Sequence, residues 1–140
     1  MKLTVLGAGA CVLTSTRACS GYWIESGSVR LRLDAWAGTM HAMTRFGLPW
    51  ETITHQFISH FQLDHCGELP GLLWCFRFGR RAPRTAPLEI LGPLGLRDLL
   101  DLPRFFGGVN VLVAEERLVE RLAAGYGGEI TVAEDGLTIE

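Results

Sequence analysis

The stretch from His60 to His65 contains three side chains that commonly bind metal ions: His60, Asp64 and His65. Zinc prefers imidazole nitrogens together with carboxylate oxygens, and it takes about four ligands. In an extended stretch, His60 and position 62 point to one side, while Asp64 and His65 can turn toward a second metal. Because the cluster directly follows the apolar stretch 56–59, we predict a metal site; the alternative is a turn in which Asp64 caps the next helix.

A second candidate site is the glycine turn at 7–9, which follows a short apolar run. Such a turn can open a dinucleotide-binding fold, and Asp34 lies at roughly the ~20-residue offset of a ribose-binding acid. That site also needs a helix N-terminus against the pyrophosphate. Val12 stands at the third glycine position, however, and 13–16 has no apolar helical face. We therefore predict a tight turn after a first strand, and keep a dinucleotide-binding domain as a distant alternative.

Apolar periodicity and turn residues predict the elements that position these side chains. Alternating or β-branched runs predict strands at 2–6, 21–25, 29–34, 56–59, 88–91 and 128–133. Helical spacing and glycine ends predict helices at 38–46, 69–78, 94–102 and 115–124. Since strands come first and then alternate with helices, the order indicates an α/β fold with a partly antiparallel sheet.

The composition fits one compact domain and excludes two classes of protein. The 140 residues are 48% hydrophobic, so a disordered chain is excluded, and no apolar run approaches the ~18 residues of a transmembrane helix. The formal net charge of −2 gives no electrostatic basis for non-specific nucleic-acid binding. The four cysteines form no C-x-x-C pair, and we predict a cytoplasmic chain whose thiols are reduced and mostly buried.

The remaining chemistry-bearing residues have plainer explanations. The arginines between 77 and 84 could hold a polyanion, but a solvated loop accounts for them better. His41 and His55 are isolated, and we predict a helix-surface residue and a loop residue. The indoles are expected to fill the core rather than to stack on bases, and they belong to Trp23, Trp36, Trp50 and Trp74.

Several stretches together resemble the metallo-β-lactamase fold hydrolases, in particular the ribonuclease Z branch of transfer-RNA 3′-processing phosphodiesterases. They are 3–9, 17–22, 31–34 with 38–39, 58–70 and 88–96, and the stretch 60–67 is the most specific. The resemblance implies one half of a four-layer αββα sandwich, with one mixed sheet and outer helices. We predict a single domain over 1–140 that is incomplete at its C-terminus, because the chain ends just after an Asp135-Gly136 turn.

The resemblance also implies roles for the candidate ligands. In such enzymes a His-x-His-x-Asp-His motif holds two zinc ions, so His60 would bind the first metal, and Asp64 and His65 would serve the second. Asp64 would also be catalytic, and Asp34 would orient the histidine loop. Gln62 stands where the family has histidine, and no histidine follows His65. We therefore expect weak or absent zinc binding by this chain alone.

The function predicted is the N-terminal part of a zinc-dependent phosphodiesterase resembling ribonuclease Z, acting on RNA or a small phosphodiester. The alternative is a non-catalytic remnant or binding module of the same fold. Half of a sandwich exposes a sheet face that its relatives bury. We therefore predict a homo-oligomer, or pairing with a complementary C-terminal half, and no membrane partner.

Overall fold

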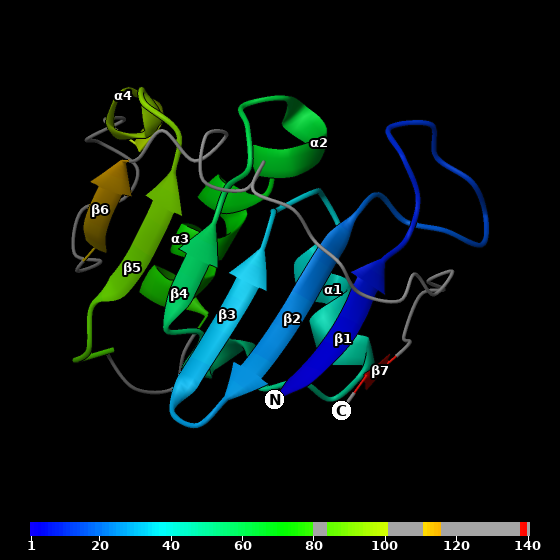
Figure 1. Cartoon of the computed structure of the whole chain (residues 1–140), viewed down its shortest axis with the longest axis horizontal. Helices are drawn as coiled ribbons and strands as arrows, with labels where there is room; N and C mark the ends of the chain where they lie inside the picture. The colour runs from blue at the N-terminus through cyan, green and yellow to red at the C-terminus, as the bar shows by residue number, and fades with distance from the viewer. Residues whose placement is uncertain (80–83, 101–110, 116–137, 140) are drawn as a thin grey trace, which may run out of the picture.

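The computed structural model of the chain describes residues 1–79, 84–100, 111–115 and 138–139 (Figure 1). The elements, in chain order, are β1 (Lys2–Gly7), β2 (Gly21–Ser26), β3 (Val29–Leu33), α1 (Thr39–Arg45), the 3-10 turn η1 (Trp50–Thr52), β4 (His55–Phe57), α2 (Leu63–Cys66), α3 (Leu69–Phe78), β5 (Leu88–Gly92), α4 (Leu96–Leu100), β6 (Val111–Glu115) and β7 (Thr138–Ile139). Within the described part of the chain, no helix has the length and apolar character that a membrane crossing requires.

The strands form one mixed sheet in the order β6-β5-β4-β3-β2-β1-β7. β1, β2 and β3 pair antiparallel, and β7 joins β1 antiparallel at the edge. From β3 through β4 and β5 to β6 the pairing is parallel, so the carboxyl ends of these strands lie along one edge of the sheet (Figure 1). The predicted mixed sheet is confirmed, and this edge is where the candidate ligands follow β4.

The helices cover one face of the sheet, and Figure 1 shows α1 and α3 behind it. Cross-strand register places Trp23, Arg32 and Gln56 in one row on this face, since Trp23 pairs with Arg32 and Arg32 with Gln56. The apolar core lies here, between the sheet and the two helices. Its largest fully buried apolar members are Trp23, Leu6, Met43, Ile53, Ile58, Leu69, Leu72, Leu73, Leu88, Ile90 and Leu96.

The opposite face of the sheet is apolar as well, and none of the described helices covers it (Figure 1). Two rows of paired residues make up this open face, because strand neighbours alternate between faces. Its half-buried apolar residues are Leu3, Tyr22, Ile24, Leu31, Leu33, Phe57 and Leu91. We refer to them below as the open face.

Most predicted elements are confirmed, and the helix 69–78 has the predicted bounds. The predicted helix 94–102 is shorter in its described part, where α4 covers Leu96–Leu100. The prediction of helix at Glu115 is wrong, because Glu115 ends β6, a strand that the Val111-Leu112-Val113 run favours and that parallel pairing with β5 extends to Glu115. The remainder of that helix, 116–124, and the predicted strand 128–133 lie outside the described residues.

Two of the aromatic and histidine predictions need correction. Trp74 is 53% exposed on α3 and contacts Phe78 at a ring-centroid distance of 4.4 Å, so it does not fill the core. His55 lies in β4, not in a loop, with its Nε2 3.4 Å from the Glu89 carboxylate. Trp23 is fully buried as predicted.

The cysteines are free, and burial differs among them. Cys19 and Cys66 are buried, Cys75 is half-buried, and Cys11 is exposed, so the prediction of mostly buried thiols holds except at Cys11. Burial raises the pKa of the Cys19 and Cys66 thiols, and nearby carboxylates raise it further.

Candidate metal centre

The candidate ligands lie just beyond the carboxyl end of β4. The backbone there is held on both sides, because the Asp34 N–H donates to the Phe57 carbonyl at 2.8 Å and the Ile58 N–H donates to the Leu91 carbonyl at 2.8 Å. Parallel pairing thus brings the end of β3, which carries Asp34, next to the segment that begins at Ser59. The short helix α2 then turns Asp64 and His65 back over this strand end.

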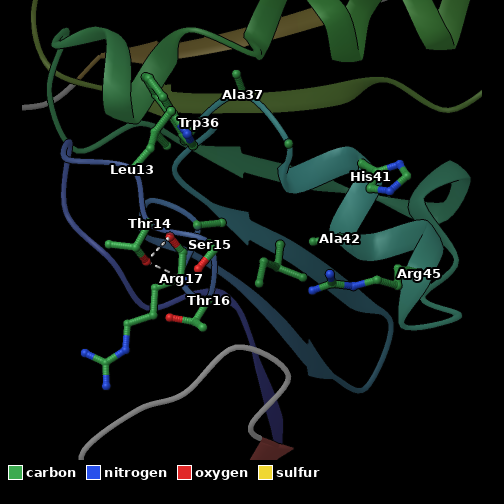
Figure 2. A pocket seen from close by; sticks show the side chains of 13 residues that line it. Leu13, Thr14, Ser15, Thr16, Arg17, Trp36, Ala37, His41, Ala42 and Arg45 are labelled. Carbon is green, nitrogen blue, oxygen red and sulfur yellow. Dashed lines mark hydrogen bonds between the residues drawn. The ribbon is translucent and has the colours of Figure 1, made fainter.

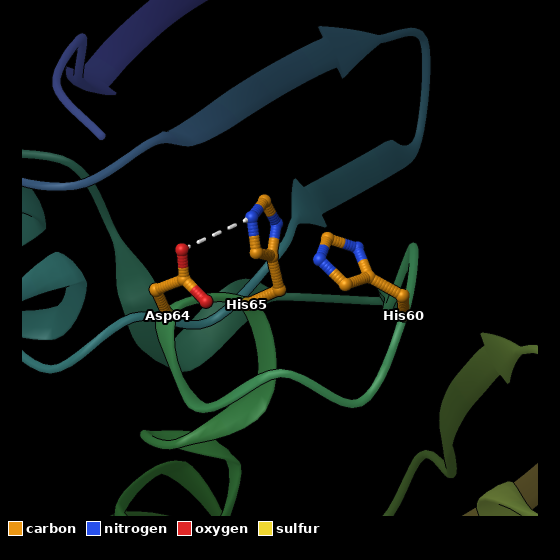
Figure 3. A group of neighbouring side chains, drawn as sticks. All are labelled: His60, Asp64 and His65. Atoms are coloured by element: carbon orange, nitrogen blue, oxygen red, sulfur yellow. Dashed lines mark ion pairs between the residues drawn. The ribbon is translucent and has the colours of Figure 1, made fainter. Parts of the chain in front are cut away.

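His60, Asp64 and His65 form a single cluster, shown in Figure 3. One ligand atom from each lies within 4.8 Å of the others, and all three side chains are half-buried. The two imidazole rings lie 3.8 Å apart between centroids, and Asp64 Oδ2 is 3.6 Å from His65 Nε2. The structure therefore brings together the three residues that the sequence analysis selected.

Asp34 holds His65 from the side opposite Asp64. Its Oδ2 lies 2.8 Å from His65 Nδ1, and its Oδ1 accepts the Ser59 N–H at 2.8 Å. A carboxylate only accepts hydrogen bonds, so we assign the proton of neutral His65 to Nδ1, which leaves the Nε2 lone pair free. Asp34 adopts φ 56°, a left-handed conformation that is unusual outside glycine and tolerated best by Asn and Asp.

Gln62 contacts the cluster through His60. Its Oε1 lies 3.1 Å from His60 Nε2, and His60 Nδ1 lies 2.9 Å from Ser59 Oγ. Both ring nitrogens of His60 thus have partners within the protein. Gln62 is also the N-cap residue of α2, and Glu68 is that of α3, so Asp64 does not cap either helix, contrary to the alternative interpretation.

Three residues near the cluster were missed by the sequence analysis. Ser59 hydrogen-bonds Asp34 through its N–H and hydroxyl, and the only signal was its place directly before His60. Arg32, which is fully buried, and Glu68, which is half-buried, form an ion pair at 3.3 Å beneath the same segment. The available signal for this pair was Arg32 itself. A charged residue that alternates with Leu31 and Leu33 in a strand lies on the opposite face from them, and if that face is buried it needs a charged partner.

The glycine turn has a structural role. A Cβ at Gly7 would overlap the Cys19 carbonyl oxygen, so glycine is required where the two segments approach, and Gly9 bridges to Cys19. Residues 10–18 form no helix, so the dinucleotide-binding alternative is wrong: no helix N-terminus follows the turn.

A pocket of about 550 Å³ lies between the 13–18 segment and α1 (Figure 2). Its walls include Trp36, His41 and the charged residues Arg17 and Arg45. Figure 2 shows Arg17 and Arg45 on opposite sides of this pocket, so their guanidinium groups do not converge on one point.

Comparison with known proteins places the chain in a family. A family model described as "Anti-Pycsar protein Apyc1" matches residues 1–94. The chain belongs to this family. Within the chain, the Apyc1-family match includes β1 to β5 and the whole His60–His65 cluster.

Curated relatives of this Apyc1-family chain carry ribonuclease Z names. A "Ribonuclease Z" from Halorubrum lacusprofundi is 34% identical over 139 residues, which are 99% of this chain and 42% of the relative. The bovine "Zinc phosphodiesterase ELAC protein 1" is 35% identical over 101 residues, 71% of this chain and 28% of the relative. The chain therefore spans less than half the length of the relatives it matches.

Solved structures give the same fold. Human tRNase Z, short form, matches with a TM-score of 0.70 and 31% identity over 82% of this chain and 45% of that one. The metallo-β-lactamase fold protein YhfI from Bacillus subtilis matches with a TM-score of 0.67 and 20% identity, over 83% and 46% of the two chains. The predicted metallo-β-lactamase fold and the likeness to ribonuclease Z are both confirmed.

Proposed function

We propose that this chain is the N-terminal part of a zinc-dependent phosphodiesterase similar to ribonuclease Z, with RNA or a smaller phosphodiester as substrate. The observation that carries the proposal is the His60–Asp64–His65 cluster with the Asp34 carboxylate behind it. The names of the relatives support the choice of zinc and of phosphodiester chemistry.

The donor set suits zinc. Zinc binds imidazole nitrogen and carboxylate oxygen at about 2.0–2.2 Å, so ligands around one ion lie roughly 3.4 Å apart. The ligand atoms of the cluster already lie within 4.8 Å of one another, so small side-chain rotations would bring them to that spacing. The Asp34–His65 contact is the type of outer hydrogen bond that fixes the tautomer of a ligating histidine.

Each residue then has a defined part in hydrolysis. Zinc, when bound, supplies Lewis-acid activation of water and of the phosphoryl group. His65 offers Nε2 as a ligand because Asp34 holds the Nδ1 proton. Asp64 is exposed enough to meet water and can accept a proton from it, as a general base must.

The arginines in the last turn of α3 and after it contribute little to this proposal. Arg84 donates to the carbonyls of Ala86 and Pro87 and lies 4.9 Å from the Phe76 ring centroid, so it braces its own loop. Arg77 lies over the Phe78 ring at 5.6 Å. Arg80 and Arg81 lie outside the described residues.

A second candidate function is a binding module of the same fold that performs no turnover. The specific observation in its favour is the Gln62–His60 hydrogen bond, because it occupies the nitrogen that a first metal would need. No histidine follows His65 in the sequence, so further imidazole ligands would have to come from another chain or segment.

The open face suggests where a chain or segment that supplies further imidazole ligands would dock. Its two rows of apolar side chains, which cross five strands from Leu3 in β1 to Leu91 in β5, would bury well against a second sheet. We propose that a complementary C-terminal half, or a second copy of this chain, covers it.

A cobalt(II) titration followed by visible absorption tests the metal proposal. We expect weak but saturable binding that His65→Ala abolishes and that His41→Ala, an exposed histidine on α1, leaves unchanged. Equal binding by wild type and His65→Ala would refute the proposal. Hydrolysis of bis-p-nitrophenyl phosphate by the wild-type chain that Asp64→Ala abolishes would show a complete site, and would exclude the binding-module alternative.

A further inference from the structure

The Glu68 carboxylate lies at the centre of a second set of hydrogen bonds beneath the metal cluster. Its Oε1 accepts the Gly38 N–H at 2.8 Å, and its Oε2 accepts the Met40 N–H at 2.8 Å and the Thr39 hydroxyl. Arg32 adds a charged donor, with Nη1 3.3 Å from Oε2. One carboxylate therefore holds three consecutive residues of the turn that leads into α1.

The backbone of Glu68 continues these contacts toward the ligands. Its N–H donates to the Ala35 carbonyl at 2.6 Å, and the Ala35 N–H donates to the His65 carbonyl at 2.7 Å. Ala35 directly follows Asp34, whose carboxylate holds the His65 ring. The segment 34–40 and the segment 65–68 are thus joined at both ends, with the Asp34–His65 contact at one end and Glu68 at the other.

Arg32 fixes the far side of Glu68. It is fully buried on β3, and it donates through Nε to Gln56 and through Nη1 to Thr39 at 3.1 Å. Burial lowers the pKa of Arg32 to about 10, and the Glu68 charge acts in the opposite direction, so the guanidinium stays charged at neutral pH. Gln56 in turn donates to the Asp34 carbonyl at 3.3 Å. Arg32 is therefore connected to Asp34 in two ways. One runs through Gln56, and the other runs through Glu68, whose N–H donates to Ala35, the residue after Asp34.

The ion pair is an inefficient way to stabilise a core. Replacing a buried pair with apolar side chains is often neutral or stabilising, and Arg32 Nη2 has no hydrogen-bond partner among the described residues. A buried unpaired donor lowers stability. What the pair supplies is a fixed position for the 34–40 turn.

We propose that Glu68, held by Arg32, is a positioning residue for the metal centre: it sets the orientation of Asp34 and His65 through the 34–40 turn. This inference rests on the proposed metal-binding function. It assigns Glu68 no contact with metal or substrate.

Glu68→Gln is the informative variant, because every group that contacts the carboxylate donates. A glutamine amide has one acceptor oxygen, so its NH2 group must face either the Gly38 N–H or the Met40 N–H. We expect cobalt(II) affinity to fall about 10- to 100-fold, the loss usual for outer-shell partners of metal ligands. Thr39→Val keeps the shape but removes the hydroxyl that donates to Glu68 and accepts from Arg32, and we expect a smaller loss of affinity than in Glu68→Gln.

Two controls separate positioning from general stability. Glu25→Gln removes a carboxylate from the more exposed pair with Arg30, at 3.2 Å, without touching the site. Val5→Ala truncates a buried residue of β1 that forms none of the hydrogen bonds described above. We expect both controls to keep cobalt(II) affinity within about two-fold, even where Val5→Ala lowers the urea midpoint as much as Glu68→Gln does.

A readout without metal distinguishes failure of this inference from failure of the proposed function. In the ¹⁵N spectrum of the His65 ring, we expect wild type to populate the Nδ1–H tautomer and Glu68→Gln to populate a mixture. A folded Glu68→Gln protein with the wild-type His65 spectrum overturns the positioning role. A Val5→Ala protein that loses as much cobalt(II) affinity as Glu68→Gln would also overturn the positioning role of Glu68. Wild-type chain that binds no cobalt(II) but shows the expected spectra refutes the metal proposal alone.

Discussion

Replacement of Asp34 separates its two roles, one in the fold and one at the metal cluster. Its carboxylate accepts hydrogen bonds from the Ser59 N–H at 2.8 Å, the Ser59 hydroxyl at 3.0 Å and His65 Nδ1 at 2.8 Å. The residue is buried, with only 8% of its surface exposed, and its φ is 56°. Asp34→Ala removes all three acceptor contacts, whereas Asp34→Asn keeps the shape and one acceptor oxygen.

The expected loss of stability follows from these contacts. A hydrogen bond to a charged group contributes about 1.5–3 kcal/mol, and bonds that share one carboxylate are not additive. Alanine in the left-handed region adds about 1 kcal/mol of strain, which asparagine largely avoids. We therefore expect Asp34→Ala to lower the free energy of unfolding by about 3–5 kcal/mol, and Asp34→Asn by about 1–2 kcal/mol.

Metal binding is expected to respond differently from stability. In Asp34→Asn the new side-chain amide would present its NH2 group to His65 Nδ1, so the ring proton would move to Nε2 and remove the lone pair that binds metal. Cobalt(II) affinity should then fall about 10- to 100-fold in Asp34→Asn while the protein stays folded. Urea unfolding and cobalt(II) titration measure the two effects, with Asp98→Asn on the exposed surface of α4 as the control. An Asp34→Asn protein with wild-type affinity, or an Asp34→Ala protein with wild-type stability, would refute the reasoning.

Three further predictions concern the ligand set, the thiols and the open face. Gln62→His should raise zinc affinity in calorimetry, because imidazole binds zinc better than a carboxamide oxygen, without creating phosphodiesterase activity; unchanged affinity would contradict a local defect at position 62. Iodoacetamide should alkylate Cys11 first and Cys19 and Cys66 slowest, since Cys11 is exposed and burial raises the pKa of the Cys19 and Cys66 thiols; mass spectrometry of the native protein measures the order, and rapid labelling of Cys19 or Cys66 would contradict it. Light scattering after size exclusion should show association that increases with concentration and that Leu31→Lys on the open face reduces; a monomeric wild type at high concentration would show that this chain covers the face itself.

Local sequence patterns were sufficient for most elements and for the identity of the candidate ligands. The alternating strands, the turn at Gly27 and the apolar spacing of α3 are local features, and each predicted element follows from them. β6 was missed although Val111, Leu112 and Val113 favour a strand locally; pairing with β5, which a local pattern does not contain, places Glu115 in that strand as well. Trp74 was placed in the core by its residue type, although its position on α3 leaves it exposed.

The sequence by itself determined the ligand types, the substitution at Gln62 and the likeness to the ribonuclease Z branch. Only the tertiary structure decided which side chains support those ligands, because the contacts join residues far apart in the chain. Asp34 and His65 are 31 positions apart, and Arg32 and Glu68 are 36 apart. Parallel pairing of β3 with β4 brings the ends of both strands to one edge, and burial of Arg32 against α1 and α3 then requires a partner carboxylate. The left-handed conformation of Asp34 likewise arises from the contacts that hold it, since its side chain is fixed by Ser59 and His65.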